Sequence, residues 1–401
     1  MSARLTQVLI QILLARLLIP AEYSLFFYYY SAITGLSMFI GESLGLTSSR
    51  FLSTATGDLR SKTNMTLMAG FLGACIASLL ILLHARYLSN ELIQLNFALV
   101  LIVYSFNLCY SGTLQYVAIA IGQRQFLAKM QLTLSVISLA TTSYVAKNWG
   151  WTTALTNLGV LVFVANAILL SKFFDFKTAR VSWSKSFREI LYVVKSALPI
   201  CGSMALGGPV HVYCISVLKN APTSTAAEVG VFGISFIFYT LLSFMPGAFG
   251  QFLVPWLLKH TTRTPENAFS MISKFYALIG TTLFVAVVIA DSAGLSRLIP
   301  TLENAEHTIL LLSGAGLVAG FVTLYSFYLN SIYKSTTVLF SSVCHSTVYV
   351  GMTYVLVEYL RMGAAGLAAA LLIASFGQLT ILFVKKKRLR YQDRNFRSRD
   401  E

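Results

Sequence analysis

Six of the ionisable side chains within or beside the long apolar runs of this chain are candidates to line a cavity, because charged groups there are costly and usually face a cavity or a partner. They are Arg16, Glu42, Arg50, Lys195, His211 and His345. Five of the six carry or can take a positive charge, so we predict a cavity that binds an anionic substrate. Glu42 and Arg50 are eight residues apart, and about two helical turns place them on one face.

Four of these five cations also have a structural interpretation. Arg50 and Lys195 could extend to the cytoplasmic headgroups, as long basic side chains do near the ends of membrane helices. Arg16 could do the same on the outer side, and His345 could simply bond a neighbouring helix. The sequence leaves both interpretations open.

The apolar run from 190 to 218 contains several residues that break helices. They are Pro199, Gly202, Gly207, Gly208 and Pro209. A proline inside a helix removes a backbone hydrogen bond and clashes with the preceding turn, and Pro246 and Gly247 interrupt a second run in the same way. Because broken helices at membrane depth are tolerated mainly beside a cavity, we predict hinges at both places. A static packing kink is the alternative.

The composition places the chain in a lipid bilayer. Hydrophobic residues make up 56%, charged residues 11%, and the mean hydropathy is +0.71, which excludes a single soluble domain. Because a spanning helix needs about 20 apolar residues, we predict an all-α polytopic membrane protein of about twelve transmembrane helices, in two six-helix lobes around a central cavity. The predicted spans are residues 5–19, 24–46, 65–85, 92–119, 127–146, 151–171, 190–218, 228–254, 271–291, 307–329, 337–359 and 364–384.

Basic residues predict the orientation, because Lys and Arg are enriched in cytoplasmic loops. With a cytoplasmic N-terminus, 23 of the 30 Lys and Arg residues lie on the cytoplasmic side and five on the other, so both termini are predicted to be cytoplasmic. The predicted divisions are an N-terminal lobe at 1–171, a cytoplasmic linker at 172–189, a C-terminal lobe at 190–384 and a basic cytoplasmic tail at 385–401. We expect the first helix to be truncated, either because the original start lies upstream or because this version has lost part of the helix.

The two lobes are predicted to be diverged copies of each other. Shifting the chain by 206 positions aligns residues 21–52 with 227–258, with 8 identities in 32 positions. The identities include Glu22 with Glu228 and Gly41 with Gly247. Both segments are a Glu-containing turn followed by a helix-length apolar run, as in an internally duplicated transporter.

Several other activities are not predicted. The five cysteines lie in apolar runs without metal-ligand spacing, so we expect small buried hydrophobic residues and no metal site. There is no P-loop motif, and we predict no cofactor and no catalytic residue. The net charge is +15, and the basic tail is typical of a stop-transfer signal against anionic lipid headgroups rather than of nucleic acid binding.

Taken together, several segments resemble a known family. Residues 15–26, with the sequence ARLLIPAEYSLF, resemble the end of the first helix and the first turn of the O-antigen flippases, which are polysaccharide-type members of the MATE-like superfamily of multidrug, oligosaccharidyl-lipid and polysaccharide exporters. Residues 197–255 resemble the start of the second half of these proteins. The segments 121–125 and 362–370 are similar to the turn before their fifth helix and to the entry of their twelfth helix.

The resemblance implies a flippase and not an enzyme. It implies alternating access, with an undecaprenyl-diphosphate-linked oligosaccharide, such as an O-antigen or capsule repeat unit, moved from the cytoplasmic to the periplasmic leaflet of a bacterial inner membrane. It implies roles in lipopolysaccharide and polysaccharide biosynthesis, with membrane lipid, an O-antigen polymerase and a chain-length regulator as candidate partners. Arg16 matches the first-helix arginine of the family's cationic cavity.

Three other classes of protein are alternatives. A cation-coupled small-molecule exporter of the same superfamily should carry acidic groups deep in a lobe, and only Glu42 meets that condition, with Asp291 and Glu358 near span ends. A polysaccharide polymerase or ligase should have a large outer loop, and no outer connection is long enough. A lipid II-type flippase is poorly separated by sequence, although that family usually has two additional helices.

Overall fold

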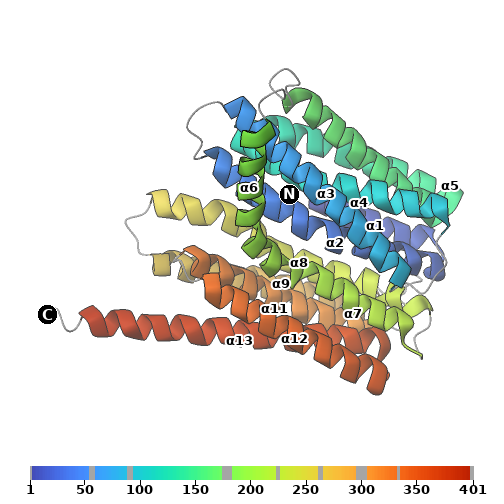
Figure 1. The fold of residues 1–401 in the computed structure, drawn as a ribbon. Helices are drawn as coiled ribbons and strands as arrows, with labels where there is room; N and C mark the ends of the chain where they lie inside the picture. Colours follow the sequence, from blue (N-terminus) through green and yellow to red (C-terminus); the bar gives the residue numbers. More distant parts are fainter. Residues whose placement is uncertain are drawn as a thin grey trace. The chain divides into compact units, whose positions relative to one another are not determined.

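The structure is a computed structural model that describes residues 2–53, 59–87, 94–173, 183–222, 226–260, 265–294, 305–331 and 335–397 (Figure 1). The described residues form helices joined by short turns, and none of them forms a strand. The predicted all-α polytopic fold is therefore confirmed. The chain divides into two compact units, Met1–Ser216 and Val217–Glu401, and each is described by itself.

Unit 1 contains six helices and most of a seventh. They are α1 (Ser2–Leu17), α2 (Pro20–Ser53), α3 (Leu59–Tyr87), α4 (Leu95–Ala120), α5 (Arg124–Phe173), α6 (Trp183–Ala205) and α7 (Gly208–Asn220). The division between the units falls inside α7. The predicted boundary of the lobes at 172–189 includes residues that the structure does not describe, and it stays a prediction.

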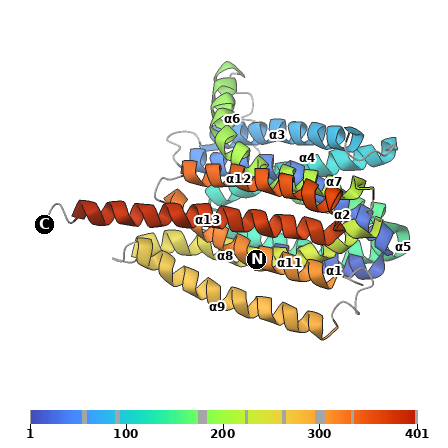
Figure 2. The same cartoon turned by 90° about the horizontal axis from the view of Figure 1, so that it is seen from below.

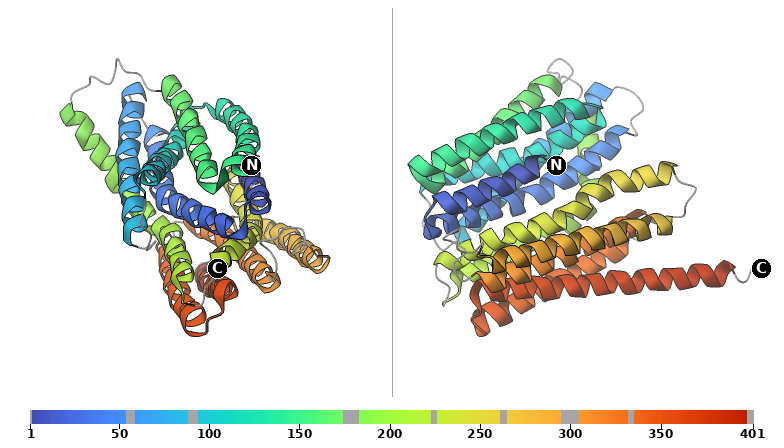
Figure 3. Two further views of the ribbon diagram at one scale, coloured as in Figure 1. Left: turned by 90° about the vertical axis from the view of Figure 1, so that its right-hand side faces the viewer. Right: turned by 180° about the vertical axis from the view of Figure 1, so that it is seen from behind.

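Unit 2 contains the remaining elements. They are α8 (Ala226–His260), α9 (Pro265–Ser292), α11 (Glu306–Ser331), α12 (Ser335–Thr353), the π-helix η3 (Tyr354–Tyr359) and α13 (Gly363–Arg397). The last helix continues as a helix through most of the predicted basic tail, and Figure 3 shows its red C-terminal end extending beyond the neighbouring orange helices.

Nine helical segments of the described residues are long and apolar enough to cross a membrane. One of them, α5, holds both the fifth and the sixth predicted spans, which meet at Gly150. That glycine has φ 80° and ψ −174°, a conformation that residues other than glycine rarely adopt. The apolar part of α1, Thr6–Leu17, is shorter than a full span, and the expected upstream start stays a prediction.

Each unit has a core built on glycine contacts between its helices. In unit 1, a Cβ atom at Gly112 of α4 would lie 2.9 Å from the carbonyl carbon of Gly41 on α2, so the two backbones touch. In unit 2, a Cβ atom at Gly316 of α11 would lie 2.6 Å from the carbonyl oxygen of Tyr239 on α8. Small residues allow membrane helices to approach this closely, and dispersion contacts then stabilise the pair. In both units, therefore, a glycine of α4 or α11 sets its contact with α2 or α8.

Each unit also contains a contact made by its own aligned glutamate. Glu228 begins α8, and its Oε2 accepts a 2.6 Å hydrogen bond from the backbone N–H of Ala364 at the start of α13. Glu22 begins α2, and its Oε1 lies 3.7 Å from the position of a Cβ atom at Gly150, where the second half of α5 begins. In unit 1 the glutamate of the turn thus lies near the glycine that opens the second half of α5, and in unit 2 it lies beside the glycine that opens α13. This geometry supports the predicted duplication.

Candidate functional site

Arg16 lies in the last turn of α1, and its side chain is exposed. The neighbouring Leu14 and Ala15 are buried, so the packed face of α1 directs the guanidinium away from the core of unit 1. The turn that follows is held by a 2.9 Å hydrogen bond from Leu18 N–H to the carbonyl of Leu14. An exposed guanidinium on a fixed helix end can donate paired hydrogen bonds to a phosphate. Its predicted role in binding stays a prediction.

Glu42 is half-buried in α2, beside the contact between α2 and α4. Its backbone nitrogen lies 3.2 Å from the position of a Cβ atom at Gly112. Arg50 follows on the same helix, but its side chain lies outside the described residues. The predicted shared face of the two residues therefore stays a prediction.

The predicted seventh span is interrupted where the sequence places its glycines. Helix α6 ends at Ala205, Leu206 and Gly207 form a turn, and α7 begins at Gly208. A Cβ atom at Gly208 would lie 2.6 Å from the carbonyl oxygen of Gly35 on α2, so this end of α7 is packed against α2. Pro209 occupies the first turn of α7, where its missing N–H costs nothing.

Two candidates, Lys195 on α6 and His211 on α7, lie on either side of this interruption. His211 is half-buried on α7, and its backbone N–H donates a 3.0 Å hydrogen bond to the carbonyl of Gly207. Lys195 is exposed on α6, which is steeply inclined to α7 in both views (Figure 1, Figure 2). The opposite face of α6 buries Ile190 and Val193 against α3. The side chain of Pro199 lies outside the described residues.

The remaining candidates belong to unit 2. His345 is half-buried on α12, with its ring centroid 6.0 Å from that of Tyr349 one turn later. Helix α8 is continuous through Pro246 and Gly247. Pro246 is buried, with its Cγ 2.9 Å from the position of a Cβ atom at Gly320, and nothing is described around Gly247. The hinge predicted in α8 stays a prediction.

Helix α2 is the element that connects the candidates of unit 1. It carries Glu42, and it contacts α6 through a 3.3 Å hydrogen bond from Ser43 Oγ to Met204 Sδ. It contacts α7 at Gly35. His345 lies in the other unit, so no single unit brings all the candidates together.

Unit 1 contains a buried polar cluster that was not predicted from the sequence. The Tyr28 hydroxyl of α2 lies 3.2 Å from Nε2 of His84 on α3 and 3.3 Å from Oγ of Ser216 on α7. All three residues are buried. A histidine inside an apolar run was the available signal, but His84 lies near the end of its span and was not singled out.

A second polar group joins α4 to α5. Asn166 Nδ2 donates a 2.7 Å hydrogen bond to the carbonyl of Asn107, and Gln131 Nε2 donates a 3.0 Å hydrogen bond to Oε1 of Gln115. Such amide bonds between membrane helices stabilise the pair by roughly 0.6 kcal/mol each. These residues therefore have a packing role.

Potential metal ligands do not cluster in the described part of the chain. No group of three or more His, Cys, Asp or Glu side chains there is arranged to hold a metal ion. The cysteines are free, and Cys109 and Cys214 are buried as predicted. The prediction was wrong for Cys75, which is exposed because it lies on the outward face of α3.

Comparison with known proteins confirms the predicted resemblance. The chain is 27% identical over 277 residues to the EPS I polysaccharide export inner membrane protein EpsE of Ralstonia solanacearum, a match that covers 63% of this chain and 59% of that protein. It is 32% identical over 85 residues to the protein of the same name from Ralstonia nicotianae, covering 21% and 19% of the two chains. The matches thus span less than two thirds of these relatives. No family model matches the chain.

Solved structures show the same fold. The lipid II flippase MurJ, in an inward closed conformation, has a TM-score of 0.73 at 13% identity, covering 96% of this chain and 86% of MurJ. An inward-facing multidrug resistance MATE family transporter of the MOP superfamily has a TM-score of 0.65 at 14% identity, covering 98% and 96%. As predicted, the similar proteins are transporters and not enzymes. The chain has the fold of MOP-superfamily transporters and is similar in sequence to a polysaccharide export protein.

Proposed function

We propose that this protein is a flippase that moves a lipid-linked oligosaccharide across a bacterial inner membrane. The cargo is an undecaprenyl-diphosphate-linked repeat unit of a surface polysaccharide, carried from the cytoplasmic to the periplasmic leaflet. The observation that carries the proposal is the similarity to a polysaccharide export inner membrane protein in a chain whose fold resembles that of a lipid flippase.

The charge distribution supports an anionic cargo. Arg16 presents an exposed guanidinium at the end of α1, and such a group can bind a diphosphate through paired hydrogen bonds. Of the acidic residues in the described helices, Glu22 and Glu228 lie at the turns of the two units. Glu42 remains as the acidic group deep in a span, which is a poor basis for cation-coupled drug export.

The proposed cycle is alternating access in a membrane protein with both termini in the cytoplasm. The excess of basic residues on one side supports this orientation. The turn at Leu206 and Gly207 supports a hinge, because an interrupted membrane helix can change direction with few hydrogen bonds lost. An O-antigen polymerase and a chain-length regulator are the partners that would receive the flipped unit.

A deletion strain tests the proposal. Loss of the gene should remove surface polysaccharide and accumulate single lipid-linked repeat units in the cytoplasmic leaflet, and a plasmid copy should restore both. If single units instead reach the outer leaflet without being polymerised, the defect lies after flipping and the proposal fails. Unchanged polysaccharide and unchanged lipid-linked units would favour a MATE-like exporter of small molecules.

The TM-score of 0.73 with MurJ makes a lipid II-type flippase the second candidate. The two cargoes share the undecaprenyl diphosphate and differ in the attached sugar. Complementation separates them: a chain that rescues growth of a strain depleted of its lipid II flippase, but not polysaccharide export, would carry lipid II.

A further inference from the structure

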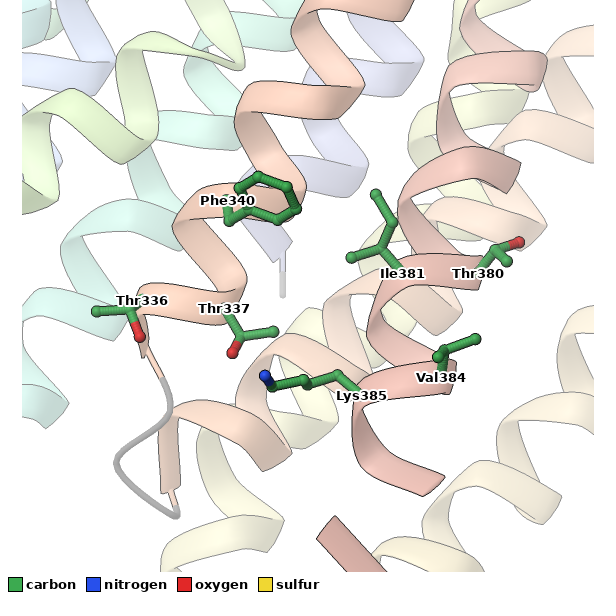
Figure 4. Close-up of a pocket in the computed structure, with 7 residues that line it drawn as sticks. All are labelled: Thr336, Thr337, Phe340, Thr380, Ile381, Val384 and Lys385. Atoms are coloured by element: carbon green, nitrogen blue, oxygen red, sulfur yellow. The ribbon is translucent and has the colours of Figure 1, made fainter. Parts of the chain in front are cut away.

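A groove separates α12 from α13 on the surface of unit 2. Its volume is about 450 Å³, within the range of small-ligand sites. It is lined by Thr336, Thr337, Phe340, Thr380, Ile381, Val384 and Lys385. In Figure 4, Ile381 of α13 points toward Phe340 of α12. The lining side chains Phe340 and Val384 are 61% and 44% exposed, so the groove is open to its surroundings.

The groove has a polar end and an apolar end. Thr336 and Thr337 begin the membrane-spanning part of α12, and Lys385 lies near the end of the spanning part of α13. In Figure 4, the Lys385 side chain extends across the groove toward Thr337. The ammonium and the two hydroxyls therefore lie where the helices leave the hydrocarbon layer, and Phe340 and Ile381 lie deeper.

A neighbouring lysine holds α13 in the rotation that presents Lys385 to the groove. The Nζ of Lys386 lies 3.5 Å from the ring centroid of Phe269 on α9, and 5.2 and 5.1 Å from those of Tyr325 and Tyr328 on α11. Lys386 is buried, at 9% exposure. Successive residues of a helix point about 100° apart, so anchoring Lys386 toward α9 and α11 directs Lys385 toward α12.

The deep end of the groove is closed by polar contacts between the same two helices. Gln378 Nε2 lies 3.5 Å from Oγ of Ser341 and 3.4 Å from Oγ of Ser342. The groove is therefore a bounded site with a cationic mouth and an apolar interior, and not a continuous strip of the lipid-facing surface.

We propose that this groove binds one anionic phospholipid of the surrounding membrane. Its phosphate accepts hydrogen bonds from Lys385 and from the hydroxyls of Thr336 and Thr337, and part of one acyl chain packs against Phe340 and Ile381. The charge supports this occupant, because the groove offers a cation and its lining includes no acidic residue. The position supports it as well, because the cation lies where lipid headgroups gather.

Fluorescence quenching in purified full-length protein tests the site. Phe340→Trp places a reporter in the groove, and the same protein without this substitution gives the background from the four native tryptophans. The probes are phosphatidylglycerol and phosphatidylethanolamine with the same brominated acyl chains, titrated in detergent. We expect phosphatidylglycerol to quench the reporter at about fivefold lower concentration, the effect of one interfacial lysine.

Two variants localise the effect. Lys385→Ala should remove the preference for phosphatidylglycerol, and Thr337→Val should reduce it. Lys387→Ala is the matched control, because Lys387 belongs to the same basic run, is exposed and does not line the groove. The preference should survive this change.

Four results would overturn the proposal. They are equal quenching by both lipids, no quenching by either, an equal loss in the Lys387→Ala and Lys385→Ala proteins, and displacement of phosphatidylglycerol by tenfold less undecaprenyl phosphate. The last would assign the groove to a cargo-type lipid. Because the assay measures binding alone, its result does not depend on the proposed transport.

Discussion

The turns at Glu22 and Glu228 begin with the same dipeptide, and both glutamates lie close to the glycine that opens a later helix. In unit 2 the carboxylate is hydrogen-bonded to the N–H of Ala364 and occupies the space where a side chain at Gly363 would lie, 2.6 Å from that Cβ position. In unit 1 the carboxylate lies 3.7 Å from the corresponding position at Gly150. The two contacts are alike in kind, and the contact in unit 2 is tight whereas the contact in unit 1 is looser.

The ends of the helices that follow these glycines differ in the same direction. Lys172 ends α5 and is exposed, with its Nζ 3.5 Å from the ring centroid of Phe126. Lys386, which lies 214 positions later, is buried among the three rings described above. Unit 2 therefore anchors both ends of the spanning part of α13 more firmly than unit 1 anchors the second half of α5.

Replacing Gly363 with alanine should give the largest effect. Gly363 has φ 54°, and a Cβ atom there would displace the Glu228 carboxylate from its hydrogen bond. We expect a loss of about 3 kcal/mol in the free energy of unfolding, measured by denaturation in mixed micelles. Gly377→Ala is the control, because nothing lies within 4 Å of its Cβ position on the same helix. Equal stability of the two variants would remove the tight contact from the comparison.

The two glutamate substitutions should give the second-largest difference in stability between the units. Glu228→Ala deletes a charge-assisted hydrogen bond and should cost about 2 kcal/mol. Glu22→Ala removes a first-turn carboxylate that interacts favourably with the positive end of the α2 dipole. This interaction is worth less than about 1 kcal/mol. Thermal midpoints at one scan rate give the order. A Glu22→Ala protein as unstable as Glu228→Ala would show that both turns are equally tight.

The two lysines give the third difference. Lys386→Ala should destabilise the protein by about 2 kcal/mol, because its cation–π contacts are desolvated, and Lys172→Ala by about 0.5 kcal/mol, because its contact is exposed. Lys387→Ala is the control for loss of charge. The comparison breaks if all three variants unfold at the same denaturant concentration.

The smallest expected effect is a coupling energy. In a double-mutant cycle, Glu228→Ala and Gly363→Ala should couple by about 1 kcal/mol or more, since both changes remove the same hydrogen bond. Glu22→Ala and Gly150→Ala should couple by less than about 0.5 kcal/mol, since the cost of Gly150→Ala comes from the backbone conformation at that position and not from a contact with Glu22. Equal coupling in the two cycles would contradict the looser contact in unit 1.

The elements of the fold were largely predictable because apolar length and helix-breaking residues are local signals. The runs of apolar residues correspond to the helices, and the turn at Gly207 lies among the predicted breaks. Lys386 shows the limit of such signals. It was predicted to belong to a basic tail that lies against lipid headgroups, yet it is buried because rings from α9 and α11, up to 117 positions away along the chain, surround it.

The candidate site was less accessible to sequence reasoning. A charged residue in an apolar run can be recognised, but the sequence does not tell which face of its helix it occupies. Arg16 is exposed and Glu42 is half-buried. Tyr28, His84 and Ser216 come together from three helices, and no spacing along the chain indicates that contact.

Transport by the purified protein tests the proposed function most directly. The protein is reconstituted into vesicles with a fluorescent diphosphate-linked oligosaccharide lipid, and the fraction reachable by an external quencher is followed with time. We expect rapid flipping by the native chain. Arg16→Ala should flip at least tenfold more slowly, which corresponds to a loss of about 1.4 kcal/mol in cargo binding. Arg16→Lys should recover part of the rate. Arg86→Ala, which alters another exposed arginine in the last turn of a unit 1 helix, should flip at the native rate. A native protein that flips no faster than empty vesicles would contradict the account.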